Sequence, residues 1–324
     1  MLIILSLMLI FYIIYTFYRI FFSPPNIQTQ GKYVLISGCD TGFGHELAIK
    51  LDKQGFSVLA GVYLPNSVIF LKDKLSSKAT VFCLDITKQE DIDAAFQLVT
   101  EKTNVLHGLV NNAGIADGAG YIDWTSMEIM RKVMNVNFFG HVAMTKKFLP
   151  LLIAKHDSRV VNISSMCGFI SLPGSGAYCA SKYALESFSD CLRREMAPWN
   201  LRVSLVEPGT MRTTMTEGLE EKLKNVWLQL PIDIKSRWGE QFFESVFKLV
   251  INSPFIRYSE KSEKVIRVLE HAIISTVPRI RYRPGWQSSL FFYPLSILPT
   301  WLVDKILSLG FGVPPDGVKY QLCS

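Results

Sequence analysis

Tyr178 and Lys182 have residue types and a spacing suited to proton transfer, because they lie four residues apart in a segment with a helical pattern. Residues four apart share one face of a helix, so the ammonium group would lie beside the phenol and favour its ionised form. The pKa of Tyr178 would then fall below its ordinary value of about 10, making it a usable general base. Ser165 stands thirteen residues earlier, at the end of a predicted strand, where its hydroxyl could hold a substrate oxygen. For Tyr178 and Lys182 taken alone, an ordinary surface pair is the alternative.

Glycines follow the first predicted strand in the segment SGCDTGFG, Ser37 to Gly44, and a helical pattern begins directly after them. Gly38, Gly42 and Gly44 would let the backbone turn sharply and approach a pyrophosphate. The N-terminus of the following helix favours an anion, since its N–H groups are unpaired and its dipole is positive there. The spacing G-x-x-x-G-x-G differs from the usual dinucleotide fingerprint, so the glycines alone are weak evidence for such a ligand.

These residues need a scaffold, and the chain from Lys32 onward alternates short apolar runs with helix-length segments. The apolar runs are Tyr33 to Ser37, Phe56 to Val62, Thr80 to Asp85, His107 to Asn112, Ser158 to Ser164 and Leu201 to Pro208. Such runs, separated by helices, predict a parallel sheet that helices cover on both faces. No Gly/Ser-rich linker divides the chain. The sequence therefore predicts an α/β fold, a Rossmann-type doubly wound sheet in one domain over residues 32–324.

Composition excludes several classes of protein. The 324 residues are 49% hydrophobic and 19% charged, too apolar for a disordered chain. The 34 basic and 28 acidic residues give a net charge of +6 and are scattered, so no nucleic-acid partner is predicted. The six cysteines form no C-x-x-C pair and do not cluster with the five histidines, so neither a metal site nor a disulfide framework is predicted.

The N-terminal segment Met1 to Phe22 is apolar except for Ser6, Thr16 and Arg19. As a helix it would be about 33 Å long at about 1.5 Å per residue, enough to cross a bilayer. It lacks the basic start and the small-residue cleavage site of a secretory signal. It is therefore predicted to be an uncleaved transmembrane signal anchor, followed by a linker over residues 23–31. A cleaved signal and a buried helix are the alternatives, and the flanking basic residues favour a cytosolic body only weakly.

Five motifs add to these features. They are NNAG at Asn111 to Gly114, NVNFFG at Asn135 to Gly140, ISSMCG at Ile163 to Gly168, YCASK at Tyr178 to Lys182 and EPGTMRT at Glu207 to Thr213. In this order and spacing the chain resembles the short-chain dehydrogenase/reductase family, densely over about Lys32 to Leu205. Within the family, GCDTGFG, DCLRREM at Asp190 to Met196 and the tail Arg281 to Asp304 are similar to the microsomal retinol dehydrogenases and their hydroxysteroid dehydrogenase relatives. The 3-hydroxybutyrate dehydrogenase branch shares the glycine motif but resembles the tail less well.

The resemblance implies a catalytic set of Asn137, Ser165, Tyr178 and Lys182. In this set Tyr178 accepts the proton, Ser165 orients the substrate oxygen, and Lys182 lowers the pKa of Tyr178 and holds the nicotinamide ribose. Ser164 is the alternative to Ser165, and the thirteen-residue offset from Tyr178 matches the family at Ser165. Asn137 would hold a water molecule that links Lys182 to solvent, or would otherwise be a capping or packing residue.

The family pattern also implies which residues hold a dinucleotide. They are Ser37, Gly38, Asp40, Thr41, Gly42, Phe43, Gly44, Asp85, Asn111, Ala113, Gly114, Tyr178, Lys182, Pro208, Gly209 and Thr213. Asp85 matches the family residue near the adenine, the loop from Asn111 to Gly114 would lie against the adenosine ribose, and Thr213 would meet the nicotinamide carboxamide.

The charge near the second predicted strand bears on the choice of cofactor. Sites for NAD commonly place an acid about 20 residues beyond the glycines, and sites for NADP need a basic residue for the 2′-phosphate. The segment Ala60 to Ser67 contains neither. Asp40 within the glycine loop would repel a 2′-phosphate, so NAD is the predicted cofactor. A turn residue that caps the following helix is the alternative role for Asp40, and both roles can coexist.

Two later segments are unusually apolar. The region of about 211–260 is rich in Trp and Phe and is predicted to be a lid over an apolar substrate, or else helices that complete the core. The apolar segment 285–311 is interrupted by Pro294 and Pro299 and by charged residues, so a second membrane span is not predicted there. An interfacial segment that touches a membrane and a buried pair of helices are equally favoured for it.

These expectations combine into one predicted function with two alternatives. The chain would be a single-pass protein of the endoplasmic reticulum membrane that oxidises a lipophilic alcohol, retinol or a hydroxysteroid, with NAD. A 3-hydroxybutyrate-type dehydrogenase acting on a small substrate is the nearest alternative, and a non-catalytic lipid-binding scaffold is the second. The exact substrate, the direction in cells, the orientation in the membrane and the presence of a homodimer stay open.

Overall fold

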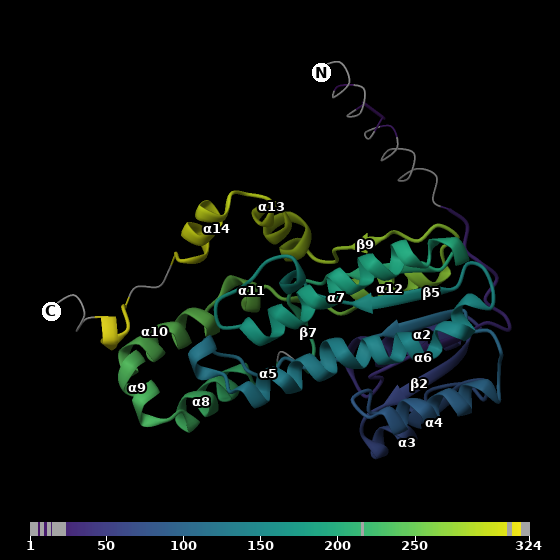
Figure 1. The fold of residues 1–324 in the computed structure, drawn as a ribbon, viewed down its shortest axis with the longest axis horizontal. Coiled ribbons are helices and arrows are strands. Elements are labelled where there is room, and N and C mark those ends of the chain that lie inside the picture. Colours follow the sequence, from purple (N-terminus) through teal and green to yellow (C-terminus); the bar gives the residue numbers. More distant parts are fainter. Residues whose placement is uncertain are drawn as a thin grey trace.

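The computed structural model describes residues 24–214, 217–309 and 313–318, together with Ser6, Ile10, Phe11 and Ile14. Its centre is a seven-stranded parallel sheet with the order β3-β2-β1-β4-β5-β6-β9 (Figure 1). The strands are β1 (Tyr33–Ile36), β2 (Ser57–Val62), β3 (Thr80–Cys83), β4 (Gly108–Asn111), β5 (Arg159–Ile163), β6 (Arg202–Val206) and β9 (Arg281–Tyr282). The first six lie within the predicted apolar runs, and the short edge strand β9 was not predicted.

Side chains of the central strands alternate between two apolar cores, one on each face of the sheet. Val34 and Ile36 of β1 belong to the first core, and Leu35 belongs to the second. All three are fully buried, which is why the strand is continuously apolar in sequence. The prediction of a sheet buried on both faces is confirmed.

Helices cover both cores (Figure 1). The first core is closed by α2 (Gly42–Lys53) and α12 (Glu263–Ile274), and the second by α4 (Gln89–Thr100), α6 (His141–Ile153) and α7 (Gly176–Glu195). Further elements are α3 (Pro65–Lys72), η1 (Ile122–Trp124), α5 (Met127–Met134), the π-helix η2 (Asn135–Gly140), η3 (Met166–Gly168) and η4 (Ala197–Trp199). Leu47 and Leu51 of α2 are four residues apart and both buried, as expected for one apolar helix face.

The strand order reverses between the neighbours β1 and β4, so the connections after these two strands lead to opposite edges of the sheet. In open α/β sheets ligands bind in the crevice that forms at such a point, outside the carboxyl ends of the strands. The glycine loop follows β1 and the NNAG loop follows β4. The topology therefore brings both predicted dinucleotide loops to this crevice.

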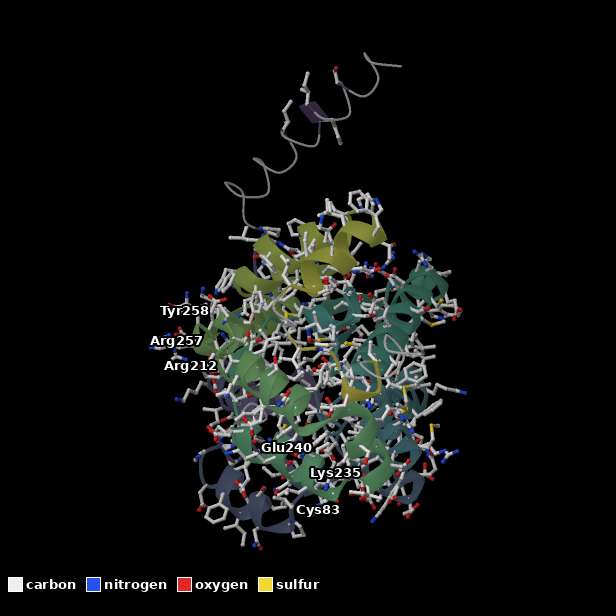
Figure 2. All side chains as sticks on the ribbon, turned by 90° about the vertical axis from the view of Figure 1, so that its left-hand side faces the viewer. Cys83, Arg212, Lys235, Glu240, Arg257 and Tyr258 are labelled. Atoms are coloured by element: carbon white, nitrogen blue, oxygen red, sulfur yellow. The ribbon has the colours of Figure 1, made fainter. Side chains whose placement is uncertain are left out.

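The aromatic region, about residues 211–260, begins at β7 (Met211–Arg212) and ends at β8 (Glu260–Lys261). These two short strands pair in parallel and form a separate sheet. The region contains α8 (Leu219–Gln229), α9 (Ile232–Trp238), α10 (Glu240–Ile251) and α11 (Pro254–Arg257). The Arg212 Nε donates to the Ser259 carbonyl at 3.0 Å. Figure 2 shows Arg212 on the same side of the molecule as Arg257 and Tyr258. The two ends of the aromatic region are therefore held together at its base.

This region has an aromatic core of its own. Trp227 stacks on Phe243 with 4.7 Å between the ring centres, and both rings lie against Trp124. The indole N–H of Trp238 donates to Asp123 at 2.8 Å. Trp124 and Asp123 belong to η1, so the aromatic region is attached to the loop that precedes α5.

The C-terminal apolar segment packs against the body through one face. It comprises η5 (Gln287–Phe292), α13 (Tyr293–Ser296) and α14 (Thr300–Leu307). Phe292 and Leu295 are buried in one cluster with Cys179 of α7. Ile297 and Trp301 are exposed. The segment therefore contributes an apolar wall near the start of α7.

The structure corrects the prediction of a single-pass protein of the endoplasmic reticulum membrane. Within the part of the chain that the structure describes, no helix is both long enough and apolar enough to cross a bilayer. Helix α7 has 20 residues, but it carries charged side chains that include Lys182, Glu186 and Asp190. The predicted anchor, Met1 to Phe22, lies outside the described residues except for Ser6, Ile10, Phe11 and Ile14.

The described part of the predicted linker, residues 24–31, is hydrogen-bonded to the body. The Ile27 N–H donates to the Ile274 carbonyl at 2.8 Å, and the Thr276 N–H donates to the Pro25 carbonyl at 3.1 Å. These bonds give the stretch a defined path beside the end of α12.

Phe148 in the second core and Phe70 on α3 form a matched pair for measuring core packing. Phe148 is fully buried and Phe70 is 68% exposed. We expect Phe148→Ala to lower the free energy of unfolding by about 3–5 kcal/mol, because it leaves a cavity that the core fills only partly. Phe70→Ala should change it by less than about 0.5 kcal/mol. Urea denaturation followed by circular dichroism measures both, and equal effects would contradict this assignment of the core.

Candidate active site

Ser165, Tyr178 and Lys182 meet at the carboxyl end of β5. Ser165 is the second residue after β5 and caps η3, where its Oγ accepts from the Cys167 N–H at 3.2 Å. Tyr178 lies in the first turn of α7, and the Ser165 hydroxyl is close enough to its phenol to favour the ionised form. Lys182 lies one turn further along α7 and is buried. The fold thus brings these three side chains into one group.

The ammonium group of Lys182 lies beside the Tyr178 ring. Its Nζ donates to the Ile163 carbonyl at 2.9 Å and is 5.6 Å from the centre of the ring. Burial lowers the pKa of Lys182 to about 8, although negative charge on Cys167 or Glu186 opposes this shift. Lys182 is therefore mostly charged at neutral pH and loses its charge at mildly alkaline pH.

The pKa of Tyr178 lies above its ordinary value, which is opposite to the prediction. Burial is the main cause, repulsion by Cys167 adds to it, and the hydrogen bond with Ser165 opposes it. Lys182 does not compensate, because its ammonium donates to the Ile163 carbonyl and stays 5.6 Å from the ring centre. Ionisation of Tyr178 at neutral pH therefore needs more positive charge than the chain alone places there.

Asn137 stands in η2 and is fully buried. Its side-chain amide accepts from the Ile115 N–H at 2.9 Å and donates to the Ile115 carbonyl at 2.9 Å and the Ser181 hydroxyl at 3.1 Å. A Cβ on Gly114 would lie 3.4 Å from Asn137 Oδ1 and 3.8 Å from Lys182 Nζ, so the amide and the ammonium are close to the same glycine. These contacts hold the loop after β4 next to Lys182. The water molecule between Asn137 and Lys182 stays a prediction.

The three glycines after β1 meet different constraints. A Cβ on Gly38 (φ +69°) would lie 2.7 Å from the Ala113 Cα, so this glycine allows two loops to pack closely. A Cβ on Gly44 would lie 2.5 Å from the Gly38 carbonyl oxygen. At Gly42 (φ +64°) nothing lies within 4 Å of the Cβ position. Of the three, Gly42 leaves room for a ligand to approach the backbone.

The N-terminus of α2 fits the pyrophosphate of a dinucleotide. Thr41 is the N-cap residue but makes no capping bond with its side chain, so it leaves the first N–H groups of the helix to a ligand. Its Oγ1 instead lies 3.0 Å from Thr214 Oγ1, which connects the glycine loop with the loop that holds Thr213. Unpaired N–H groups beside the open space at Gly42 make an anion site.

Asn112 binds the glycine loop but was not among the residues predicted from the sequence. Its Nδ2 donates to the Ser37 and Gly38 carbonyls at 2.9 and 2.8 Å. Ser37 is fully buried, and its Oγ accepts from the N–H groups of Asn112 and Ala113 at 3.1 and 3.2 Å. The signal for Asn112 was present in the NNAG motif, where it stands second.

Three of the predicted dinucleotide residues make internal contacts. Asn111 is fully buried and donates to Thr145 Oγ1 at 2.9 Å and Asn162 Oδ1 at 2.8 Å, so its side chain does not reach the crevice. Asp85 accepts from the N–H and hydroxyl of Thr87 at 3.0 and 2.7 Å. Phe43 packs partly buried against the first core.

Asp40 caps the turn after β2. Its carboxylate accepts from the Tyr63 and Leu64 N–H groups, each at 2.8 Å. Asp40 therefore holds the turn after β2 and does not cap α2, whose N-cap residue is Thr41. The repulsion of a 2′-phosphate by the same carboxylate stays a prediction.

Pro208 and Gly209 connect the loop after β6 with the rest of the site. The Pro208 carbonyl accepts from the Met166 N–H at 2.9 Å, which joins this loop to the segment that carries Ser165. A Cβ on Gly209 would lie 2.9 Å from the Gln287 Cβ, so the glycine lets the C-terminal segment pack against the loop.

In the part of the chain that is described, no group of three or more His, Cys, Asp or Glu side chains could hold a metal ion. The described cysteines, Cys39, Cys83, Cys167, Cys179 and Cys191, are free.

A doubly wound parallel sheet with a glycine loop at its switch point and a Ser-Tyr-Lys group at its strand ends defines a dinucleotide-dependent oxidoreductase. The family model for short chain dehydrogenases matches residues 32–224, and the chain belongs to this family. It is 41% identical to 17-beta-hydroxysteroid dehydrogenase type 6 of Bos taurus, over 89% of this chain and 92% of that protein. It is 41% identical to retinol dehydrogenase 5 of Mus musculus, over 91% of this chain and 93% of that protein. The predicted resemblance to the retinol and hydroxysteroid dehydrogenase branch is confirmed.

Solved structures share the fold. A short-chain dehydrogenase from Streptomyces avermitilis aligns with a TM-score of 0.67 at 24% identity, covering 85% of this chain and 93% of that one. A short chain dehydrogenase/reductase from Burkholderia phymatum in complex with NAD aligns with a TM-score of 0.68 at 19% identity, covering 86% and 96%. At these identities the likeness shows the fold alone.

Gly38 and Gly42 form a matched pair, because both have positive φ and Gly38 alone of the two is tightly packed. Alanine at either position costs about 1–2 kcal/mol for the left-handed backbone. At Gly38 the new methyl group also meets the Ala113 backbone, and overpacking of this kind costs about 1–3 kcal/mol more. We expect Gly38→Ala to lower the free energy of unfolding more than Gly42→Ala does, measured by urea denaturation without cofactor. The reverse order would show that the loop packing is misassigned.

Proposed function

We propose that this chain oxidises a lipophilic alcohol, retinol or a hydroxysteroid, to the carbonyl compound with NAD. The observation that carries the proposal is the meeting of Ser165, Tyr178 and Lys182 at the carboxyl end of β5, with the Lys182 ammonium 5.6 Å from the centre of the Tyr178 ring. Relatives at about 40% identity are named for retinol and for 17-beta-hydroxysteroids, which supports the substrate class.

The surroundings of Tyr178 support an apolar substrate. Its ring packs against a cluster that includes Met166, Ile170, Phe292 and Leu295. Burial of apolar substrate surface here would contribute about 25 cal/mol per Å². A small hydroxy acid would instead need a free cation, and Arg283 beside this cluster is already paired with Glu207 at 2.7 Å and stacked on Tyr293. The apolar surroundings therefore favour the lipophilic substrate over 3-hydroxybutyrate.

In the proposed reaction, the Tyr178 phenolate accepts the proton of the substrate hydroxyl. Ser165 donates a hydrogen bond to the same oxygen and holds it beside Tyr178. When bound, NAD supplies the hydride acceptor and the positive charge of its nicotinamide ring. Lys182 adds the charge of its own ammonium, so that the phenolate, which burial disfavours, becomes accessible near neutral pH. Ser165 and Tyr178 thus act on the substrate oxygen and its proton, and Lys182 acts through Tyr178.

The residues that would hold NAD come from the loops after β1, β4 and β6. The N-terminus of α2 and the open space at Gly42 would take the pyrophosphate. Thr213 would meet the nicotinamide carboxamide, and Ala113 with Gly114 would line the ribose. Asp40 of the glycine loop is bonded to the turn after β2, where its carboxylate would disfavour the 2′-phosphate of NADP. The preference for NAD rests on the charge of this carboxylate.

Asp40→Asn tests the choice of cofactor. Asparagine keeps one acceptor oxygen for the turn and removes the charge. We expect the ratio of kcat/KM with NADP to kcat/KM with NAD to rise on the order of tenfold, since one like-charge repulsion is removed. Initial rates with each cofactor measure this ratio. An unchanged ratio would mean that Asp40 serves the turn alone.

Tyr178→Phe tests the chemistry. The ring stays and the proton acceptor is lost, so we expect NADH production to fall on the order of 10³-fold or more, with NAD still bound. NADH absorbance measures the first quantity and fluorescence titration the second. Unchanged turnover would sink the proposed mechanism, and no binding of NAD to the unmodified protein would favour a lipid-binding scaffold.

The substrate class is tested on the unmodified protein. Retinol, an androstanediol-type steroid and 3-hydroxybutyrate are assayed side by side at equal concentration. We expect turnover of retinol or the steroid and little turnover of the hydroxy acid, because the cluster around Tyr178 is apolar. Preferential turnover of 3-hydroxybutyrate would overturn the assignment.

A further inference from the structure

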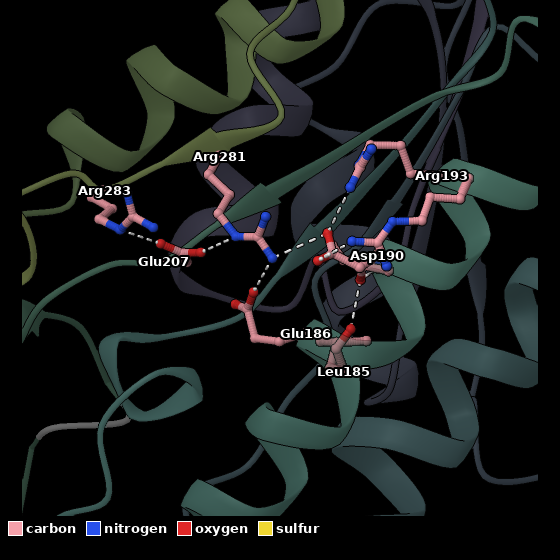
Figure 3. Close-up of polar contacts among 10 residues, drawn as sticks. Leu185, Glu186, Asp190, Arg193, Glu207, Arg281 and Arg283 are labelled. Carbon is pink, nitrogen blue, oxygen red and sulfur yellow. Dashed lines mark hydrogen bonds and ion pairs between the residues drawn. The ribbon is translucent and has the colours of Figure 1, made fainter. Parts of the chain in front are cut away.

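Three carboxylates and two arginines gather between α7, the end of β6 and β9 (Figure 3). Arg281 makes ion pairs with Glu186 at 3.3 Å, Asp190 at 3.1 Å and Glu207 at 3.0 Å. Arg283 pairs with the other oxygen of Glu207 at 2.7 Å. None of the five was predicted as a site residue, although Glu207 directly precedes the loop after β6.

Glu186 is the carboxylate that faces the catalytic residues. It lies one turn after Lys182 on the buried face of α7. Its side chain lies beside the hydroxyl of Ser164, the neighbour of Ser165. A Cβ on Gly168 would lie 2.6 Å from Ser164 Oγ and 2.9 Å from Glu186 Cγ, so the glutamate packs directly against the serine segment. One side chain therefore touches the segment of Ser165 and shares a helix face with the lysine.

Glu186 and Glu207 are both paired with arginine. Burial raises the pKa of each carboxyl group, and repulsion by Glu186 adds to the shift at Glu207. The charges of Arg283 and Arg281 oppose the shift at Glu207, and the Ser164 hydroxyl and the charge of Arg281 oppose it at Glu186. The ion pair with Arg281 at 3.3 Å therefore favours the ionised form of Glu186.

The titratable groups that face Lys182 come from each element packed around it. They are Tyr178 and Glu186 on α7, Cys167 on η3 and His141 on α6. Burial lowers the pKa of His141 to about 3, so this imidazole is neutral at neutral pH. The pKa values of Cys167 and Tyr178 are raised, so both are protonated. Glu186 is the carboxyl group among them, and its ion pair with Arg281 favours its ionised form.

We propose that Glu186 is a positioning residue, the counter-ion that keeps Lys182 charged in its buried place while holding the Ser164 segment against it. The inference rests on the proposed function, in which the charge of Lys182 favours the phenolate of Tyr178. Removing one partner from a buried pair leaves the other charge uncompensated, so the lysine would lose its proton more easily. Arg281 holds the carboxylate of Glu186 in position.

Glu186→Gln and Glu207→Gln are a matched pair that tests this role. Each puts an amide in place of one carboxyl partner of Arg281, but Glu207 follows β6 and does not share the helix face of Lys182. The pKa of Lys182 is measured in the full chain, without substrate or cofactor, by competitive acetylation with acetic anhydride and mass spectrometry. We expect about 8 in the unmodified protein. We expect a value lower by on the order of one unit in Glu186→Gln, and one near the unmodified value in Glu207→Gln.

A second pair of variants covers the case in which Glu186→Gln does not fold. Glu186→Asp keeps the charge and should keep the pKa of Lys182 near the unmodified value. Ser164→Ala removes a hydroxyl that lies beside Glu186 and favours its anion, and it should lower the pKa of Lys182 by a smaller amount. In turnover assays, the kcat deficit of Glu186→Gln should grow as the pH rises, because Lys182 loses its charge earlier.

A purely structural role gives a different result. It would lower the melting temperature of both Gln variants alike. It would also leave the pKa of Lys182 unchanged in Glu186→Gln and Ser164→Ala, and that result would overturn the inference. Because acetylation needs no substrate, failure to turn over retinol or steroids would count against the proposed function and leave this measurement intact. The two failures are therefore distinguishable.

Discussion

The buried ammonium of Lys182 is the group around which the active site is arranged. A charge removed from water needs polar partners or it loses its proton. The Ile163 carbonyl at the end of β5 supplies one partner, and Glu186 supplies negative charge one turn along α7. Both partners exist only when α7 packs on the sheet with this face inward. Tyr178 comes into place with Lys182, because the two residues share that face.

Burial also decides what Tyr178 can do. The apolar cluster that would receive a steroid or retinoid includes Phe292 and Leu295 from the C-terminal segment, and Tyr178 packs partly buried against it. This burial raises the pKa of Tyr178, so the free protein holds a neutral tyrosine at neutral pH. Under the proposed function, base formation would be coupled to cofactor binding. One packing arrangement would then provide both an apolar substrate site and a tyrosine that ionises only when positive charge is added.

Much of the site could be predicted because its signals are local. The six apolar runs contain the first six strands of the sheet, and the Tyr178 to Lys182 spacing places both residues on one helix face. Features that depend on long-range contacts could not be predicted. Glu186 and Arg281 are 95 residues apart in sequence, and nothing near either residue indicates the other. Asn111 ends a predicted strand, but its pairing with Asn162 on the neighbouring strand, not its place in a motif, turns it away from the crevice.

By itself, the sequence determined the family, the doubly wound fold class and the order of the Ser-Tyr-Lys residues, because periodicity and short spacings are properties of neighbouring residues. Only the tertiary structure decided which of these groups lose contact with water. It reversed the expected pKa shift of Tyr178, showed Asp40 as the cap of a turn, and showed no described helix fit to span a bilayer. The burial of a group depends on packing between segments far apart in the chain, and the pKa of the group depends on that burial.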